Sequence, residues 1–242
     1  MRGNLTLPLQ TLQGLAERPG EAHGLGVLDA ALVRDLARAG AAHPGSEFCV
    51  TIIDRHGHAV GHGCCTPVTA EKRRGKSGKS PPGPAPPGPV PPGDAARDRA
   101  TFTPSGSAGP DGGHGSWTLT LPGAPHPYRV DIDPVPTYDC DHRHETTAYQ
   151  PGAKLRHLVQ VRDGACSYPT CSRHARDSDF EHAVPYDKGG RTCACNAHAC
   201  SRSCHQVKQS PGWKVTKPRP GWTHWATAAG RVYLQGPWRY PC

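Results

Sequence analysis

The sequence has few of the large apolar side chains that build a protein core. Among its 242 residues are 3 Phe and 1 Met, and aromatic residues make up 6% of the chain. Glycine and proline are abundant instead, with 29 and 27 residues. The length would suffice for one large domain, but this composition favours small cores joined by loops and linkers.

Long apolar runs are also absent. No stretch approaches the roughly 18 apolar residues of a membrane-spanning helix. The first residues, MRGNLTLPLQTLQGL, lack the continuous apolar segment and small-residue cleavage site of a secretory signal. We therefore expect a cytoplasmic protein whose 11 cysteines are reduced and available as metal ligands.

Basic residues are concentrated in the C-terminal part. The residues after Gln150 include 14 Lys and Arg against 5 Asp and Glu, in a chain whose net charge is +8. Clustered positive charge favours a polyanionic partner, because phosphates gain from counterion release when they bind Lys and Arg. A basic surface that only keeps the protein in solution is the alternative.

Residues 1–69 are expected to form a small α+β region. Residues 4–15 predict a strand followed by a turn or helix, and residues 48–63 predict a hairpin that turns at residues 54–57. Between them lies an expected amphipathic helix with Asp29 as its N-cap. Its apolar stripe is Leu28, Leu32, Leu36 and Ala39. The hairpin histidines are interpreted as solvated rather than as a metal site; they are His56, His58 and His62.

A segment rich in proline and glycine interrupts this region. Residues 70–115 contain PPGPAPPGPVPP, in which 8 of 12 residues are proline. Such a segment neither buries apolar area nor pairs its backbone, so it predicts a disordered spacer. Residues 116–150 contain WTLTL and YRVDID, which predict a strand pair. Because strands on both sides of a spacer can pair, we favour an insertion within one N-terminal region over two independent domains.

Residues 151–242 form the predicted C-terminal module, which opens with a helix over residues 152–166. Leu155, Leu158 and Val159 form its expected inner face, while Arg156 and Arg162 are expected to reach outward.

Four cysteines of this module have the spacing of a structural zinc site. Cys166 and Cys171 lie in CSYPTC, a knuckle that lets two thiolates converge on one ion. Cys200 and Cys204 are four residues apart and share one face if the segment is helical. A small module with little core needs such a staple, since zinc binding contributes folding free energy on the order of 10 kcal/mol.

A second set of polar residues lies among these cysteines. Glu181 and His182 precede a Gly-Gly turn, and Asn196 and His205 follow it. On a helix, the side chains of Cys204 and His205 point about 100° apart, so each can face a different site.

In CSYPTC, FEHAVPYDKGGRT, Asn196 and CHQVK the sequence resembles the HNH endonucleases, whose fold is the ββα-metal fold. The flanking segments resemble, more weakly, bacterial proteins in which a domain of unknown function precedes the HNH module. The expected fold class is therefore α+β. It comprises a small N-terminal α+β region with a Pro/Gly-rich linker, followed by a zinc-stapled ββα-metal module.

The resemblance implies a role for each matching residue. His182 matches the general base that activates water, and Asn196 matches the residue that holds the base and its loop. Glu181 and His205 match the ligands of a catalytic divalent metal, Mg²⁺, Mn²⁺ or Ni²⁺. The implied reaction is hydrolysis of DNA phosphodiester bonds in double-stranded DNA with low sequence specificity. The basic residues expected to contact the DNA are Lys188, Arg191, Arg202 and Lys208.

Two positions depart from the family pattern. Glu181 stands where Asp is usual, and Ser201 stands where the family has a zinc-binding Cys. Cys200, Cys195 or Cys193 must then provide the fourth thiolate, and we favour Cys200 on helix geometry, with Cys195 next.

Two other functions remain open. One is a catalytically inactive, zinc-dependent nucleic-acid-binding module, and the other is a zinc-stapled scaffold for protein partners.

The C-terminal tail holds four of the five tryptophans, Trp213, Trp222, Trp225 and Trp238. Interleaved basic residues would allow them to stack on nucleic-acid bases. We favour a hairpin that packs its aromatic side chains over the small zinc module, because tryptophan enlarges a poor core.

Overall fold

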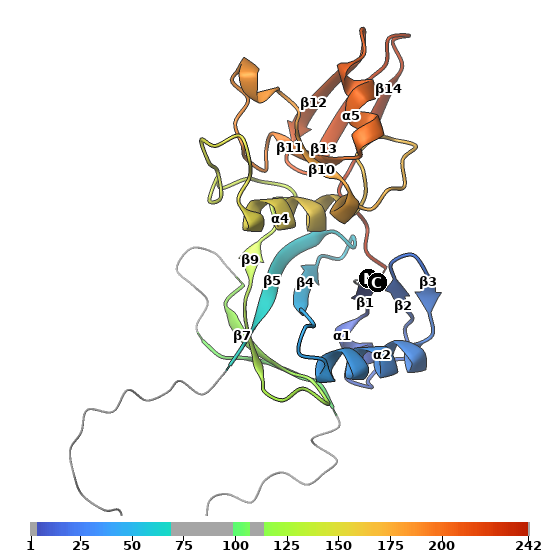
Figure 1. Cartoon of the computed structure of the whole chain (residues 1–242), viewed down its shortest axis with the longest axis vertical. Helices are drawn as coiled ribbons and strands as arrows, with labels where there is room; N and C mark the ends of the chain where they lie inside the picture. Colours follow the sequence, from blue (N-terminus) through green and yellow to red (C-terminus); the bar gives the residue numbers. More distant parts are fainter. Residues whose placement is uncertain (1–3, 69–98, 107–113, 242) are drawn as a thin grey trace, which may run out of the picture. The chain divides into compact units, whose positions relative to one another are not determined.

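The computed structural model describes residues 4–68, 99–106 and 114–241. These residues form a mixed α and β structure, as the sequence predicts (Figure 1). They fall into two compact units. The first comprises the described residues within Met1–Cys49, Cys64–Ala108 and Gly115–Asp131, and the second those within Val50–Gly63, Gly109–His114 and Ile132–Cys242. Most of the predicted spacer, residues 70–115, lies outside the described residues.

Small elements make up the first unit. They are β1 (Leu5–Thr6), α1 (Leu9–Leu12), β2 (Gly20–Ala22), β3 (Gly26–Leu28), α2 (Ala30–Ala42), β6 (Thr101–Pro104), β7 (Ser116–Thr120) and β8 (Tyr128–Asp131). Strands β1, β2 and β3 form an antiparallel sheet in that order. Strand β6 lies within the predicted spacer and pairs with β7, which also pairs with β8 as predicted. The spacer prediction is therefore wrong at this strand, because its alternating TFTP segment completes a sheet.

Helix α2 has the predicted cap but not the predicted apolar face. The Asp29 carboxylate accepts a hydrogen bond from the backbone N–H of Leu32 at 2.9 Å. Leu32 and Leu36 are exposed, however. The buried residues of the helix are Ala30, Val33 and Ala41. Because Gly20 of β2 has no side chain, Val33 packs directly on that strand, and the smaller residues face inward.

Strands β4 (Cys49–Ile53) and β5 (Ala59–Pro67) form the predicted hairpin and continue from one unit into the other. The backbone N–H of Gly57 donates to the Asp54 carbonyl at 3.0 Å, and Gly57 has φ of 81°, which glycine adopts without strain. His62 is buried and its Nδ1 lies 2.9 Å from Thr51 Oγ1. The interpretation of His62 as a solvated residue is therefore wrong.

The second unit contains the residues of the predicted module. Its elements are β9 (Asp133–Pro134), α4 (Ala153–Asp163), the 3₁₀ turn η1 (Ala175–Asp177), β10 (Asp179–His182), the 3₁₀ turn η2 (Tyr186–Lys188), β11 (Ala197–Cys200), α5 (Arg202–Gln209), β12 (Lys214–Arg219), β13 (Trp222–Ala226) and β14 (Val232–Gln235). The unit takes in residues from Ile132 onward instead of starting at residue 151, because Val135 packs against Leu158 and Val161 of α4.

Helix α4 provides the core of the second unit and runs beneath β10 and β11 in Figure 1. Leu155 and Val159 pack against Ala194 and Ala197, as the predicted inner face requires. Arg162 does not reach outward. Its side chain is fully buried, it pairs with Asp163 at 2.7 Å, and it donates hydrogen bonds to the carbonyls of Ala194 and Ala197 at 2.8 and 2.7 Å. Burial of this charge is possible because carbonyl and carboxylate groups surround it.

The tail forms the antiparallel sheet β12-β13-β14. Trp225 of β13 is 0% exposed and lies among Tyr168, Trp213 and four cysteines. The preferred interpretation of the tail, in which it packs aromatic side chains over the cysteine-rich module, is confirmed for Trp225. Among the described residues, no helix combines the length and the apolar content that a membrane span requires.

Candidate functional site

Two antiparallel strands and a helix hold most of the predicted site residues. In the β10–β11 pair, Glu181 lies opposite His198 and His182 lies opposite Ala197. Helix α5 follows β11 directly (Figure 1). It begins after Ser201, whose hydroxyl accepts a hydrogen bond from the backbone N–H of Cys204 at 3.3 Å. This serine cap explains why the helix starts there.

Glu181 meets two basic side chains of α5. Its Oε2 lies 2.6 Å from Nδ1 of His205, and its Oε1 lies 2.6 Å from Nζ of Lys208. Lys208 also donates to the backbone carbonyl of His182. The structure therefore brings Glu181 and His205 together, as predicted. It engages Lys208 inside the protein, with 10% of its side chain exposed, instead of presenting it to solvent.

His182 faces a different set of groups. Its Nε2 lies 2.9 Å from Oγ1 of Thr192, and Tyr149 stacks on the ring with centroids 5.6 Å apart. His182 is 5% exposed, and this burial lowers the pKa of the imidazole below its ordinary value. Neutral imidazole, the form that accepts a proton, is favoured by the same burial.

Asn196 holds both ends of the loop between β10 and β11. Its Oδ1 accepts from the backbone N–H of Val184 at 2.8 Å, and its Nδ2 donates to the carbonyls of Val184 and Arg191 at 3.0 Å each. Gly190 allows this closure, because a Cβ there would clash with the Val184 carbonyl. The predicted loop-holding role of Asn196 thus has a direct structural counterpart.

The predicted catalytic metal would have two protein ligands. A carboxylate oxygen and an imidazole nitrogen suit a divalent cation, and Glu181 and His205 present them to each other. No group of three or more close Cys, His, Asp or Glu ligand atoms among the described residues includes either one. A metal held by this pair would have to take its remaining ligands from water or substrate oxygens.

Three of the four predicted zinc ligands assemble. The Sγ atoms of Cys166, Cys171 and Cys204, here called the knuckle group, lie within 4.8 Å of one another. Thiols at this spacing, of which those of Cys166 and Cys204 are buried, fit a zinc ion. Cys200 is fully buried and packs beside this group but is not part of it. A hydrogen bond from Cys200 lowers the pKa of Cys166 to about 5, which favours the thiolate form.

Ser201 lies close to the knuckle group at the position where the family pattern has cysteine. Its Oγ lies 3.7 Å from Cys171 Sγ, and its backbone N–H donates to Cys166 Sγ at 3.3 Å. The alternative fourth ligand, Cys195, is not near this group. It precedes β11, whereas Cys200 is the last residue of that strand and Cys204 lies beyond it in α5.

Cys195 belongs instead to a group that sequence reasoning missed. Cys140, His142, Cys193 and Cys195, here called the loop group, have ligand atoms within 4.8 Å of one another. The sequence carries a weak signal for it, since Cys140 and His142 form C-x-H and Cys193 and Cys195 form C-x-C. Fifty-three positions separate Cys140 from Cys193, so spacing along the chain does not join the two halves.

The other basic residues predicted to contact DNA lie at the surface. Arg191 pairs with Glu145 at 2.8 Å and Arg202 with Asp179 at 3.4 Å, and both arginine side chains are more than 70% exposed. Lys188 is exposed at the end of the η2 turn. The side chains of these three residues are therefore exposed to solvent.

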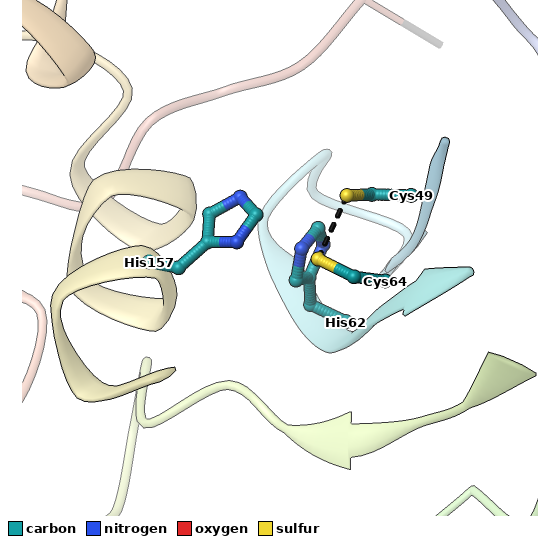
Figure 2. A group of neighbouring side chains, drawn as sticks. All are labelled: Cys49, His62, Cys64 and His157. Atoms are coloured by element: carbon teal, nitrogen blue, oxygen red, sulfur yellow. Dashed lines mark hydrogen bonds between the residues drawn. The ribbon is translucent and has the colours of Figure 1, made fainter. Parts of the chain in front are cut away.

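Figure 2 shows four other ligand-type side chains. In the first unit, Cys49 and Cys64 have their sulfur atoms 2.8 Å apart. In the second unit, the rings of His62 and His157 have centroids 4.6 Å apart. Each pair alone supplies two ligands, fewer than the four of a structural zinc site.

Comparisons with known proteins give relatives but no function. No family model matches the chain, and no solved structure matches it. Uncharacterized protein Rv3776 of Mycobacterium tuberculosis is 31% identical over 90 residues, which are 37% of this chain and 17% of that protein. Uncharacterized protein Rv2100 of the same organism is 30% identical over 95 residues, 37% of this chain and 16% of that protein. The chain thus matches about a sixth of the length of these relatives.

Proposed function

We propose that this chain is a metal-dependent endonuclease of the HNH type that hydrolyses DNA phosphodiester bonds. The observation that carries the proposal is the contact between Glu181 on β10 and His205 on α5, 2.6 Å apart. This contact joins a strand pair to the following helix, the order that the ββα-metal fold requires. His182 and Asn196, which match the remaining family positions, lie at the end of β10 and just before β11.

The site residues divide the chemistry among them. Glu181 and His205 would hold the divalent cation, which supplies charge stabilisation to the scissile phosphate when bound. His182, neutral because of its burial, would take the proton from the attacking water. Thr192 fixes the orientation of the His182 ring through its hydrogen bond to Nε2. Asn196 keeps the loop closed behind the base.

We propose double-stranded DNA as the substrate, and the exposed positive charge supports a polyanionic one. Lys188, Arg191 and Arg202 are exposed and lie on the loop and helix that surround Glu181 and His182. Contacts of such side chains to phosphate oxygens position the backbone without reading bases. We therefore propose low sequence specificity for this module.

A catalytically inactive, zinc-dependent nucleic-acid-binding module is the second candidate, and two contacts favour it. Lys208 holds one carboxylate oxygen of Glu181 and competes with a metal for it. In addition, Glu181 and His182 contact opposite sides of β10, since consecutive strand residues alternate between faces. If Lys208 stays in place when DNA binds, the pair holds no catalytic metal.

Plasmid nicking with Mg²⁺, Mn²⁺ or Ni²⁺ tests the first candidate. The wild-type chain should nick supercoiled DNA with at least one of these metals. His182→Ala should abolish nicking and retain the zinc content of the wild type. His224→Ala is a matched control, because His224 lies on β13 and bonds to Thr216 rather than to a site residue.

The outcomes separate the two candidates. Equal nicking by wild type and His182→Ala would rule out the assignment of the base. Binding of a labelled duplex without cleavage across all three metals would support the inactive module. For either candidate, affinity for DNA should fall steeply with salt concentration, because phosphate contacts release counterions.

A further inference from the structure

The loop group has the dimensions of a metal site. Cys140 Sγ lies 3.5 Å from Cys193 Sγ, and Nδ1 of His142 lies 3.2 Å from Cys193 Sγ and 3.9 Å from Cys195 Sγ. A tetrahedral zinc ion, with Zn–S bonds of about 2.3 Å and Zn–N bonds of about 2.0 Å, separates its ligand atoms by about 3.5 to 3.8 Å. The observed separations scatter closely around these values.

We propose that Cys140, His142, Cys193 and Cys195 bind a zinc ion of their own, separate from any ion in the knuckle group. Three thiolates and one imidazole form one of the common closed donor sets of structural zinc. The soft sulfur donors disfavour Mg²⁺ and Ca²⁺, which take oxygen ligands. All four ligands lie in the second unit, and the site does not depend on the proposed nuclease function.

The backbone at His142, one of the four proposed ligands, has an unusual conformation. His142 has φ of 57°, the one positive φ among the described residues other than glycine. A residue in this left-handed conformation costs about 1 kcal/mol or more, although histidine tolerates it better than most residues. Here that conformation directs Nδ1 toward two thiols. Cys193, which lies between the other ligands, is 1% exposed.

A hydrogen-bond network continues outward from the proposed site. Glu145 Oε2 lies 3.0 Å from Nδ1 of His142, and Glu145 Oε1 accepts from Arg191 at 2.8 Å. When Nδ1 binds the ion, Glu145 loses this contact and keeps its pairing with Arg191. The Glu145 carboxylate therefore keeps a positively charged partner, Arg191, whether or not the ion is bound.

The ion would fasten the segment around Cys140 to the loop that precedes β11. Thr192, beside Cys193, accepts from the backbone N–H of Thr146 at 3.1 Å and bonds to His182 through its hydroxyl. Asn196, beside Cys195, closes the loop between β10 and β11. The loop-group ion would thus position two residues that hold His182 and its loop.

Metal content of the full-length chain tests the proposal. Native mass spectrometry after purification with reductant should show one zinc ion fewer in Cys140→Ser and in His142→Ala than in the wild type. His142→Cys preserves four ligands and should retain the wild-type number. His144→Ala is the matched control, because His144 lies two residues further along and is not in the loop group.

Cobalt substitution provides a second measurement, because the absorption of bound Co²⁺ reports the number of thiolate ligands directly. Apo protein titrated with Co²⁺ should show thiolate-to-cobalt charge transfer with tetrahedral d–d bands, and their amplitude should be lower in the Cys140→Ser variant. The proposal is overturned if wild type and Cys140→Ser bind equal zinc. Recovery of Cys140 and Cys193 as a disulfide from the freshly purified wild type would overturn it as well.

Discussion

The knuckle group and the loop group lie at opposite ends of strand β11 and use similar ligand atoms in different surroundings. The knuckle group packs against Trp225, Tyr168 and Trp213, in the aromatic core of the tail. The loop group has a buried thiol at its centre, but Cys140 and Cys195 are half-buried and the His142 side chain is 55% exposed. Ligand chemistry alone therefore does not decide what a metal does for the protein.

The surroundings assign different physical roles to the two groups. An ion in the knuckle group would be the centre of a core that has few other apolar residues, so its binding energy would be folding energy. An ion in the loop group would link two surface segments to each other. The core beneath them is already formed by the packing of α4. Loss of the first should unfold the module, whereas loss of the second should loosen a loop.

The largest difference is expected between Cys204→Ser and Cys140→Ser. Cys204→Ser should abolish cooperative unfolding of the second unit, because the zinc contribution to folding is on the order of 10 kcal/mol. Cys140→Ser should keep a folded core and unfold at a moderately lower temperature. Near-UV circular dichroism, which reports the packed tryptophans, and thermal denaturation would measure both. Loss of the near-UV signal in both variants would contradict the comparison.

Arg162 donates hydrogen bonds to the backbone at the start of β11, and its replacement should give the next largest effect. Arg162→Met removes a buried charge. It leaves Asp163 without its positive partner and the carbonyls of Ala194 and Ala197 without their donor. Breaking a buried pair in this way typically costs about 3–5 kcal/mol. Urea denaturation should show this loss. Arg191→Met, at an exposed position, is the control and should leave the midpoint nearly unchanged.

Thr192→Val should have a smaller effect on stability and a clear one on activity. The substitution keeps the shape of the side chain but removes the hydroxyl that bonds to the buried Nε2 of His182. An unsatisfied buried polar group costs about 1–3 kcal/mol. Under the proposed function, plasmid nicking should fall while zinc content stays unchanged, and Thr192→Ser should recover much of the activity. Full activity of Thr192→Val would show that this hydrogen bond does not position the base.

The smallest expected effect is a difference in the rate of zinc release between the knuckle group and the loop group. With the wild-type chain and excess chelator, zinc release followed by a colorimetric dye should have two phases. The fast phase should come from the exposed loop group, because solvent and chelator reach His142. Cys195→Ser should remove the fast phase and leave the slow one. A single phase in the wild type, unaffected by that substitution, would contradict the assigned order.

Local structure followed from short-range patterns in the sequence. The Asp29 cap, the turn ending at Gly57 and the inner face of α4 depend on residues within one or two turns of each other, and the structure contains all three. The predicted apolar face of α2 was wrong. Val33, rather than the larger leucines, is buried because it packs on Gly20. The prediction that Arg162 reaches outward was wrong for a similar reason. Its guanidinium donates to carbonyls of residues 32 and 35 positions further along the chain.

By itself, the sequence determined which side chains are chemically able to bind metal and which residues lie next to each other on β10 and α5. Glu181 and His205 meet because a strand and the helix that follows the hairpin have few ways to pack. Tertiary structure alone decided how the cysteines are grouped. Cys193 and Cys195 lie nearer to Cys200 along the chain than to Cys140, yet β11 extends between them and Cys200. An extended strand keeps its two ends apart. The packing of α4 against the loop before β11 brings Cys140 to the end of the strand where Cys193 and Cys195 lie.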